Sequence, residues 1–291
     1  MSDYLKKEDY EEPACVFCKP ETIKRIDSPR VIEKLDEYLS RADYPSAERH
    51  LNYWLEEARI NGDGRGQITV YSELVGLYRK LGRRDEALTA CERLTEAIES
   101  ENLGDSVTAA TSYLNIATAY KAFSMAEKAM PLYEKAREIY EKSLARSDSR
   151  LGGLYNNTAL ALTDLGRYSE ARKFNEMALA VMEQNEGCEP ERAITYLNMA
   201  SSAEAENGLE NSEEFIKNCV LKADALLETP GLARDDNYAF VCEKCAPVSP
   251  QIAECLNLSP ETVKWYRKKL LVKFDVANVA ELIAKVVTGN R

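Results

Sequence analysis

Four of the eight cysteines stand in two Cys-x-x-Cys pairs, "CVFC" (Cys15 and Cys18) and "CEKC" (Cys242 and Cys245). Thiolates at this spacing are ligands of structural zinc sites and also form redox pairs. More than 220 residues separate the two pairs, far beyond the spacing of a compact zinc ribbon. We therefore predict reduced thiols with no metal or other cofactor, and we keep a zinc site built from both pairs as the alternative. A redox enzyme would need a lowered thiol pKa, which nothing in the sequence supports.

The chain has a single histidine, His50, which lies among helix-forming residues in "AERHLNYWLEEA". Metal–His sites, Ser–His triads and Cys–His dyads would all depend on this one ring, and we interpret it as an ordinary helical position. No GxxxxGK[ST] or GxGxxG phosphate-binding pattern is present. Catalysis would rest on carboxylates alone, and these have the distribution of solvated helix faces. The sequence therefore predicts no catalytic residues and no enzyme.

The net charge of −11 is divided unevenly along the 291 residues. Residues 249–291 hold seven cationic and four acidic side chains, a balance of +3, so residues 1–248 carry −14. This length allows two domains, or one elongated array with a small module. The start, "MSDYLKKEDYEEP", lacks the basic flank and apolar core of a secretory signal, and no apolar run reaches the roughly 20 residues needed to cross a bilayer. We therefore expect a cytoplasmic protein.

The middle of the chain repeats itself with a period of 42 residues, in segments 76–88, 118–130 and 160–172. Looser copies lie at 40–51 and 203–215. Each copy has the pattern of two amphipathic helices, the first ending at a small residue suited to a left-handed turn, and the second carrying an alanine that permits close helix contact. The recurring residues are Gly82, Ser124 and Gly166; Ala87, Ala129 and Ala171; and Tyr71, Tyr113, Tyr155 and Tyr196, the last after 41 residues.

This pattern resembles the tetratricopeptide repeat, with the longer period of the kinesin-light-chain type. The resemblance covers about residues 28–228, close to five helix pairs. It implies an all-α fold in which the pairs stack into a right-handed superhelix with a concave groove. We expect a polar tail at 1–27, the array at 28–230, a capping or connecting segment at 231–248 and a separate module at 249–291.

Asparagine recurs in the first helix of three copies, at Asn115, Asn157 and Asn198. The resemblance implies that this helix lines the groove, where an amide can hold the main chain of a bound peptide because it both donates and accepts hydrogen bonds. The alternative is that these amides bond within their own helix pair. The recurring tyrosines fit packing better than binding, since each can bury its ring and keep its hydroxyl in water.

The basic ending has the pattern of short helices. In residues 249–258, a Ser–Pro start is followed by an apolar face, and 259–274 repeats it: Ser259 is a helix cap, Pro260 the first helical residue and Glu261 a favourable early negative charge. Residues 276–287 have the pattern of a third amphipathic helix. Two short helices joined by a tight connection, the second of them basic, form a helix-turn-helix.

The match is closer than this general class. Ser259, the run Thr262-Val263-Lys264, Leu270 and Asn278 follow the LuxR/GerE-type DNA-binding domain over about 40 residues. The resemblance implies that helix 260–273 enters the major groove and that the last helix, about 277–287, forms a homodimer contact. Tyr266, Phe274 and Val279 replace the usual His, Leu and Arg. The DNA-binding residues implied are Thr262, Lys264, Trp265, Arg267, Lys268 and Lys273.

One departure concerns the helix that precedes this pair in the family. Its place is taken by residues 234–248, "RDDNYAFVCEKCAPV", which do not match. This segment could be a helix that caps the last repeat and replaces the missing element; alternatively the module is truncated and does not dock on DNA. We predict a DNA-binding transcription regulator whose array senses a peptide or protein, with double-stranded DNA as partner. The alternative is a non-enzymatic interaction scaffold whose last helices only cap the solenoid.

Overall fold

The computed structural model describes residues 24–232, and every structural statement below concerns these residues. Several predictions lie outside them. These are the zinc alternative at Cys15, Cys18, Cys242 and Cys245, most of the polar tail, nearly all of the connecting segment, and the whole of the basic module with its DNA-binding residues.

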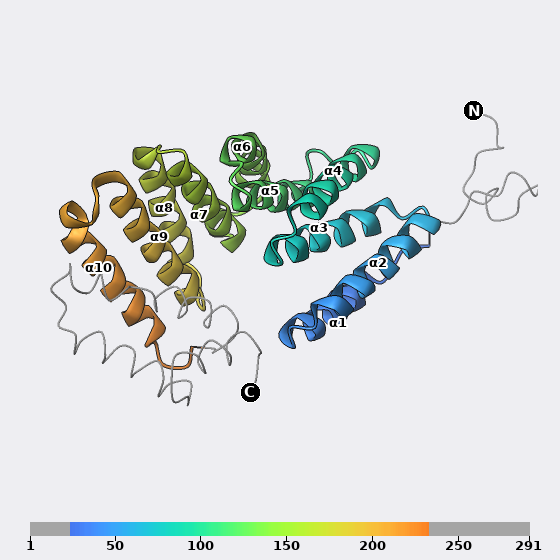
Figure 1. Ribbon diagram of the computed structural model, residues 1–291, viewed down its shortest axis with the longest axis horizontal. Helices are drawn as coiled ribbons and strands as arrows, with labels where there is room; N and C mark the ends of the chain where they lie inside the picture. Colours follow the sequence, from blue (N-terminus) through green and yellow to red (C-terminus); the bar gives the residue numbers. More distant parts are fainter. Residues whose placement is uncertain (1–23, 233–291) are drawn as a thin grey trace, which may run out of the picture.

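Ten α-helices and no strand occupy residues 24–232, which confirms the all-α prediction. They form five consecutive pairs, as the repeat pattern predicted (Figure 1). The pairs are α1 (Ser28–Ser40) with α2 (Tyr44–Ile60), α3 (Gly64–Lys80) with α4 (Arg84–Ser100), α5 (Val107–Ala122) with α6 (Ala126–Ser143), α7 (Ser149–Asp164) with α8 (Tyr168–Met182), and α9 (Glu189–Asn207) with α10 (Leu209–Leu227). None of these ten helices is long and apolar enough to span a membrane.

The turns inside the first four pairs have the predicted left-handed backbone. Gly82 and Gly166 have φ of +68° and +71°, and Ser124 takes the same conformation at +60°. In the first pair Ala42 does so at +53°. In the fifth pair the turn residue Gly208 has φ +78° but ψ 164°, so the chain leaves α9 in a different direction. The fifth turn is therefore built differently from the other four.

Small residues in the second helices sit where pairs of helices approach most closely. Ala47, Ala87, Ala129 and Ala171 are all fully buried, as the aligned alanines predicted. The fifth pair carries Ser212 at this place, and its hydroxyl donates to the Ala203 carbonyl oxygen at 2.8 Å. A buried serine can be accommodated because that bond satisfies its hydroxyl.

The apolar core is continuous over most of the array and then divides. One cluster runs from Val31 in α1 to Met182 in α8. The fifth pair instead has two small clusters, one around Leu197 and Leu227 and the other around Ile216 and Cys219. The last pair is thus joined to the array by less apolar packing than the other pairs share with one another.

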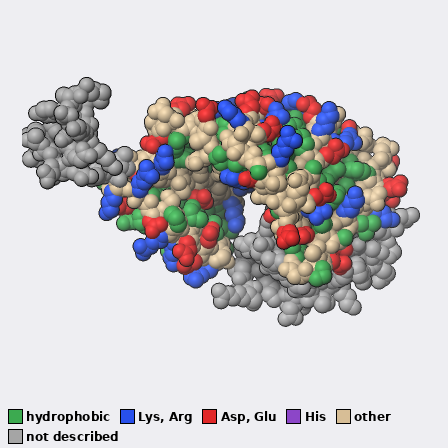
Figure 2. Space-filling model, turned by 180° about the vertical axis from the view of Figure 1, so that it is seen from behind, with side chains coloured by type: hydrophobic (Ala, Val, Ile, Leu, Met, Phe, Trp, Pro, Cys, Tyr) green, Lys and Arg blue, Asp and Glu red, His purple; other side chains and the backbone are tan. Residues whose placement is uncertain are grey.

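The array is curved, and its first helices lie on the inner side (Figure 1). The first helices of successive pairs contact one another, α3 with α5, α5 with α7 and α7 with α9. The corresponding second helices approach each other less closely, which is the geometry of a stack that bends toward its first helices. Acidic and basic side chains are interspersed over the face shown in Figure 2.

Candidate functional site

The three predicted groove asparagines lie on the inner helices but differ in their bonds. Asn115 in α5 is half-buried, and its amide has no hydrogen-bond partner within residues 24–232. Asn157 in α7 is half-buried and donates through Nδ2 to the Gly153 carbonyl oxygen of its own helix at 3.0 Å. Asn198 in α9 is 5% exposed and donates to Asn156 Oδ1 in α7 at 3.0 Å. The ladder thus changes from an unpaired amide to a structural contact between repeats.

The same ladder has a member in α3 that the asparagine pattern did not include. Glu73 lies 42 residues before Asn115, at the equivalent place, and is half-buried. Burial raises the pKa of its carboxyl above the usual value, with a smaller contribution from the negative charge of Asp36. Reading the 42-residue spacing backwards from Asn115 would have found this residue. The inner face therefore carries a carboxyl in α3 and amides in α5 to α9.

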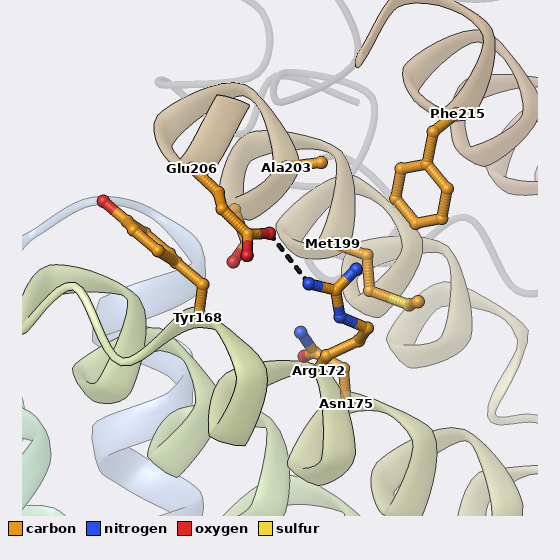
Figure 3. A pocket seen from close by; sticks show the side chains of 8 residues that line it. Tyr168, Arg172, Asn175, Met199, Ala203, Glu206 and Phe215 are labelled. Carbon is orange, nitrogen blue, oxygen red and sulfur yellow. Dashed lines mark hydrogen bonds and ion pairs between the residues drawn. The ribbon is translucent and has the colours of Figure 1, made fainter. Parts of the chain in front are cut away.

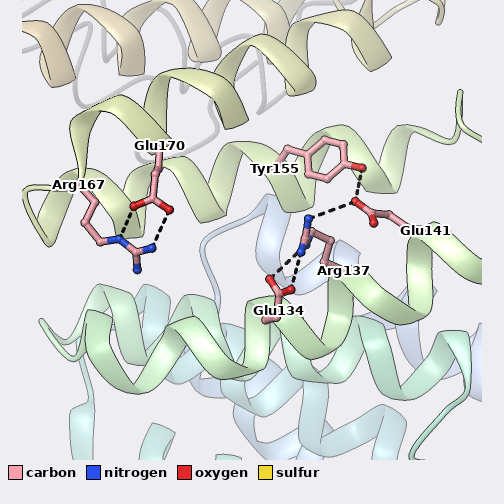
Figure 4. Close-up of polar contacts among 6 residues, drawn as sticks. All are labelled: Glu134, Arg137, Glu141, Tyr155, Arg167 and Glu170. Atoms are coloured by element: carbon pink, nitrogen blue, oxygen red, sulfur yellow. Dashed lines mark hydrogen bonds and ion pairs between the residues drawn. The ribbon is translucent and has the colours of Figure 1, made fainter.

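The recurring tyrosines pack into the core. Tyr113 and Tyr155 are buried, and each hydroxyl has a charged partner at 3.0 Å, Lys135 Nζ for Tyr113 and Glu141 for Tyr155. Burial, followed by the bond to Glu141, raises the pKa of Tyr155 to about 12. Figure 4 shows that Glu141 also pairs with Arg137, which contacts Glu134 on the same helix. These contacts tie α6 to α7, so this part of the tyrosine ladder is structural.

A small pocket opens where the fourth and fifth pairs meet (Figure 3). Tyr168, Arg172 and Asn175 of α8 line it on one side, with residues of α9 as its floor and Phe215 of α10 beyond. Arg172 pairs with Glu206 of α9 at 2.8 Å. Asn175 is 1% exposed, yet its Oδ1 has no hydrogen-bond donor within residues 24–232. No sequence motif predicted this pocket.

The described cysteines and the histidine have the environments of structural residues. Burial raises the thiol pKa of Cys91 to about 12 and that of Cys219 to about 11. The pKa of half-buried Cys188 is raised too, first by burial and then by nearby glutamates. His50 bonds the Val31 carbonyl oxygen at 3.0 Å through Nε2 and lies edge-on to Tyr38. Within residues 24–232 there is no group of three or more His, Cys, Asp or Glu side chains that could hold a metal ion.

The DNA-binding residues implied by the sequence, from Thr262 to Lys273, lie outside the described residues and remain predictions.

Three family models match the chain. Two are described as "Tetratricopeptide repeat" and match residues 66–142 and 152–189. The third is described as "Bacterial regulatory proteins, luxR family" and matches residues 248–286. The first two cover α3 to α6 and α7 to α8, and the third covers most of the basic ending. A comparison with curated proteins found no match.

Similar folds occur among solved structures. BtubC (BKLC) from P. vanneervenii is 23% identical with a TM-score of 0.57, over 69% of this chain and 82% of that one. A putative kinesin light chain from Podosopora anserina with nearly identical TPR-like repeats is 20% identical with a TM-score of 0.51, over 68% and 94%. PilW, a widely conserved type IV pilus biogenesis factor, is 14% identical with a TM-score of 0.56, over 90% and 100%.

At these identities the structures show the fold alone, a helical repeat solenoid. Together with the family matches, they show that the chain is a tetratricopeptide-repeat protein of kinesin-light-chain-like period, whose C-terminal segment resembles the LuxR/GerE-type helix-turn-helix.

Proposed function

We propose that the chain is a DNA-binding transcription regulator in which the array receives a peptide or protein and residues 249–291 bind double-stranded DNA. The observation that carries this proposal is the presence of tetratricopeptide matches at 66–142 and 152–189 and a luxR-family match at 248–286 in one chain. Both families are generally non-enzymatic, so the proposal requires no catalytic residue and no cofactor.

The division of charge supports separate tasks for the two parts. Residues 1–248 carry −14 and residues 249–291 carry +3. DNA phosphates repel the first part and attract the second, so contact with DNA would be confined to the basic end of the chain. Thr262, Lys264 and Trp265 would lie near the bases, and Arg267, Lys268 and Lys273 near phosphates or base edges. A homodimer through residues 277–287 would give a two-fold symmetric site.

The inner face of the array is the proposed input surface. Asn115 has an amide without a partner in the described residues, and Asn157 keeps its amide oxygen when Nδ2 bonds its own helix. Such groups can bond the main chain of an extended peptide whatever its side chains. In this proposal Asn198 serves mainly to join α9 to α7, because its Nδ2 is committed to Asn156.

Selection from a random DNA pool, read by fluorescence anisotropy at two salt concentrations, tests DNA binding. The intact chain is compared with Arg267→Ala/Lys268→Ala and with Arg234→Ala/Lys244→Ala. The second double change removes the same charges outside the matched residues 248–286. We expect the intact chain and the control to select a symmetric site. The Arg267/Lys268 variant should bind at least about tenfold more weakly, with a salt slope lower by about 2.

A second function is favoured by one observation. The luxR-family match begins at residue 248, so the family's preceding helix has no counterpart in the matched segment. The chain would then be a non-enzymatic interaction scaffold whose last helices cap the solenoid. Equal failure of all three forms to bind DNA would establish this alternative over the regulator.

A further inference from the structure

The pocket at the fourth and fifth pairs occupies a place that is closed elsewhere in the array. On the outer side of the array, each second helix and the next one flank a crevice whose floor is the first helix between them. Between the third and fourth pairs, Tyr133 of α6 is 1% exposed and its hydroxyl donates to Thr118 Oγ1 at 3.4 Å. Forty-two residues later, Asn175 is equally buried but its Oδ1 has no donor within the described residues. A buried carbonyl oxygen without a donor is destabilising, so its presence calls for a reason beyond packing.

The rim of this crevice is also polar where its counterpart is apolar. Met130 and Leu165 pack on the core between the third and fourth pairs. At the equivalent places, Arg172 and Glu206 form an ion pair at 2.8 Å. Exposed ion pairs contribute little stability, whereas the apolar side chains that they replace would have closed the crevice. The rim is therefore open to solvent where the other one is sealed.

An aromatic wall completes the site. Phe174 of α8 is partly buried against the core, whereas its equivalent in α10, Phe215, is 41% exposed. Met199 of α9 lies in the floor, and Figure 3 shows Phe215, Met199, Arg172 and Asn175 around the same space. The crevice thus offers an apolar wall and floor, a guanidinium at the rim and a buried amide oxygen that lacks a donor.

We propose that this outer crevice binds an aromatic side chain with a hydrogen-bond donor, tyrosine or tryptophan, of a peptide partner. The ring packs against Phe215 and Met199, and the phenol or indole hydrogen bonds the Asn175 amide oxygen. Aliphatic side chains lack the donor, and serine and threonine lack the apolar body. The guanidinium of Arg172 attracts an aromatic face and repels cationic side chains.

The occupant is assigned to a partner because the crevice is far from the point where the chain leaves the array. Phe215 lies in the second turn of α10, and the helix runs on to Leu227, about 18 Å further along its axis. This inference rests on the part of the proposed function that makes the array a peptide-binding surface. It does not depend on DNA binding, and it uses the outer side of the array rather than the inner asparagines.

The test follows the side-chain amide of Asn175 by NMR in the isotope-labelled full chain, with N-acetyl-tyrosinamide as the probe. The resonance is assigned by its loss in Asn175→Leu. We expect a saturable shift in the millimolar range. N-acetyl-phenylalaninamide, which lacks only the hydroxyl, should bind at least about threefold more weakly. Anisotropy with DNA in the same samples reports the regulator activity separately.

The Asn175→Leu variant separates binding from folding. It removes an unpaired polar group from a buried position, so its melting temperature should rise, while binding of the tyrosine probe, read at labelled Met199, should weaken at least about fivefold. Asn218→Leu, at an exposed position of α10, should leave both unchanged. Three results would overturn the proposal: no saturable shift, equal binding of both amides, or close contacts in the free chain between Asn175 and a ring of residues 233–291.

Discussion

The second to fourth helix pairs and the fifth pair follow one repeat pattern but are built differently. From α3 to α8 the core is continuous, the turns are left-handed and the alanines of the second helices are fully buried. In the fifth pair the core divides into two small clusters and the turn takes another conformation. Buried polar atoms without partners, Asn175 Oδ1, Glu189 Oε2 and Arg192 Nε among them, lie at the junction of the fourth and fifth pairs.

This difference shows where the array is optimised for packing and where it is not. A solenoid is stabilised mainly by contacts between neighbouring units, so a poorly packed junction lowers the stability of the terminal unit without unfolding the rest. The same junction holds the pocket and an exposed aromatic residue. We infer that the regular pairs form the frame and that the fourth–fifth junction is the place where a partner can alter the array.

The largest effect is expected from emptying the continuous core. Leu154 of α7 is fully buried in that cluster, and Leu154→Ala should lower the free energy of unfolding by about 3–4 kcal/mol. Ile216 of α10 belongs to a small cluster, and Ile216→Ala should cost about 2 kcal/mol. Urea unfolding followed by circular dichroism measures both. Hydrogen exchange should show that Ile216→Ala mainly increases opening of α9 and α10. Equal losses with uniform exchange would contradict the difference between the regions.

The turns provide the next comparison. Gly208 has φ +78° and ψ 164°, a conformation that is almost confined to glycine, and Gly208→Ala should cost about 2 kcal/mol. Gly166 has φ +71°, and its equivalent Ser124 tolerates a side chain at φ +60°, so Gly166→Ala should cost only about 1 kcal/mol. An added Cβ meets nothing within 4 Å at either glycine, so backbone strain alone is compared. The reverse order of urea midpoints would remove the turn as a cause of the difference.

The asparagine ladder gives a smaller effect that separates structure from binding. Asn198→Ala leaves Asn156 Oδ1 without its donor at a buried contact and should lower stability by about 1–2 kcal/mol. Asn115→Ala breaks no hydrogen bond within the described residues and should change stability by less than about 0.5 kcal/mol. In a peptide-display selection against the array, Asn115→Ala should instead reduce the recovered peptides. Unchanged recovery with Asn115→Ala would leave this ladder without a binding role.

The repeat architecture could be predicted from the sequence because its determinants are local. Each turn needs one small residue and each close approach one alanine, so the 42-residue spacing was enough to predict five helix pairs. The matches of 66–142, 152–189 and 248–286 to known families were likewise carried by residues in short windows.

The bonding of the site residues could not be predicted because it depends on neighbours in other repeats. Asn115, Asn157 and Asn198 are equivalent in sequence, and their different partners follow from what stands on the adjacent helix. The replacement of Tyr133 by Asn175 is visible at a spacing of 42. That its oxygen lacks a donor depends also on the packing of α9 and α10, which no motif encodes.

The smallest effect, and one of opposite sign, is expected within the regular pairs. Ser124 takes a left-handed conformation at φ +60°, which costs a non-glycine residue roughly 1–2 kcal/mol. Ser124→Gly removes that strain but also gives the unfolded chain more freedom, a loss of about 0.4–1 kcal/mol. Because the strain is the larger contribution, the variant should be about 0.5 kcal/mol more stable. Gly82→Ser, the reverse change at the equivalent turn, should be destabilised by a similar amount. Shifts of the urea midpoint in opposite directions, at constant slope, would show that these two turns are interchangeable, and shifts in the same direction would show that they are not.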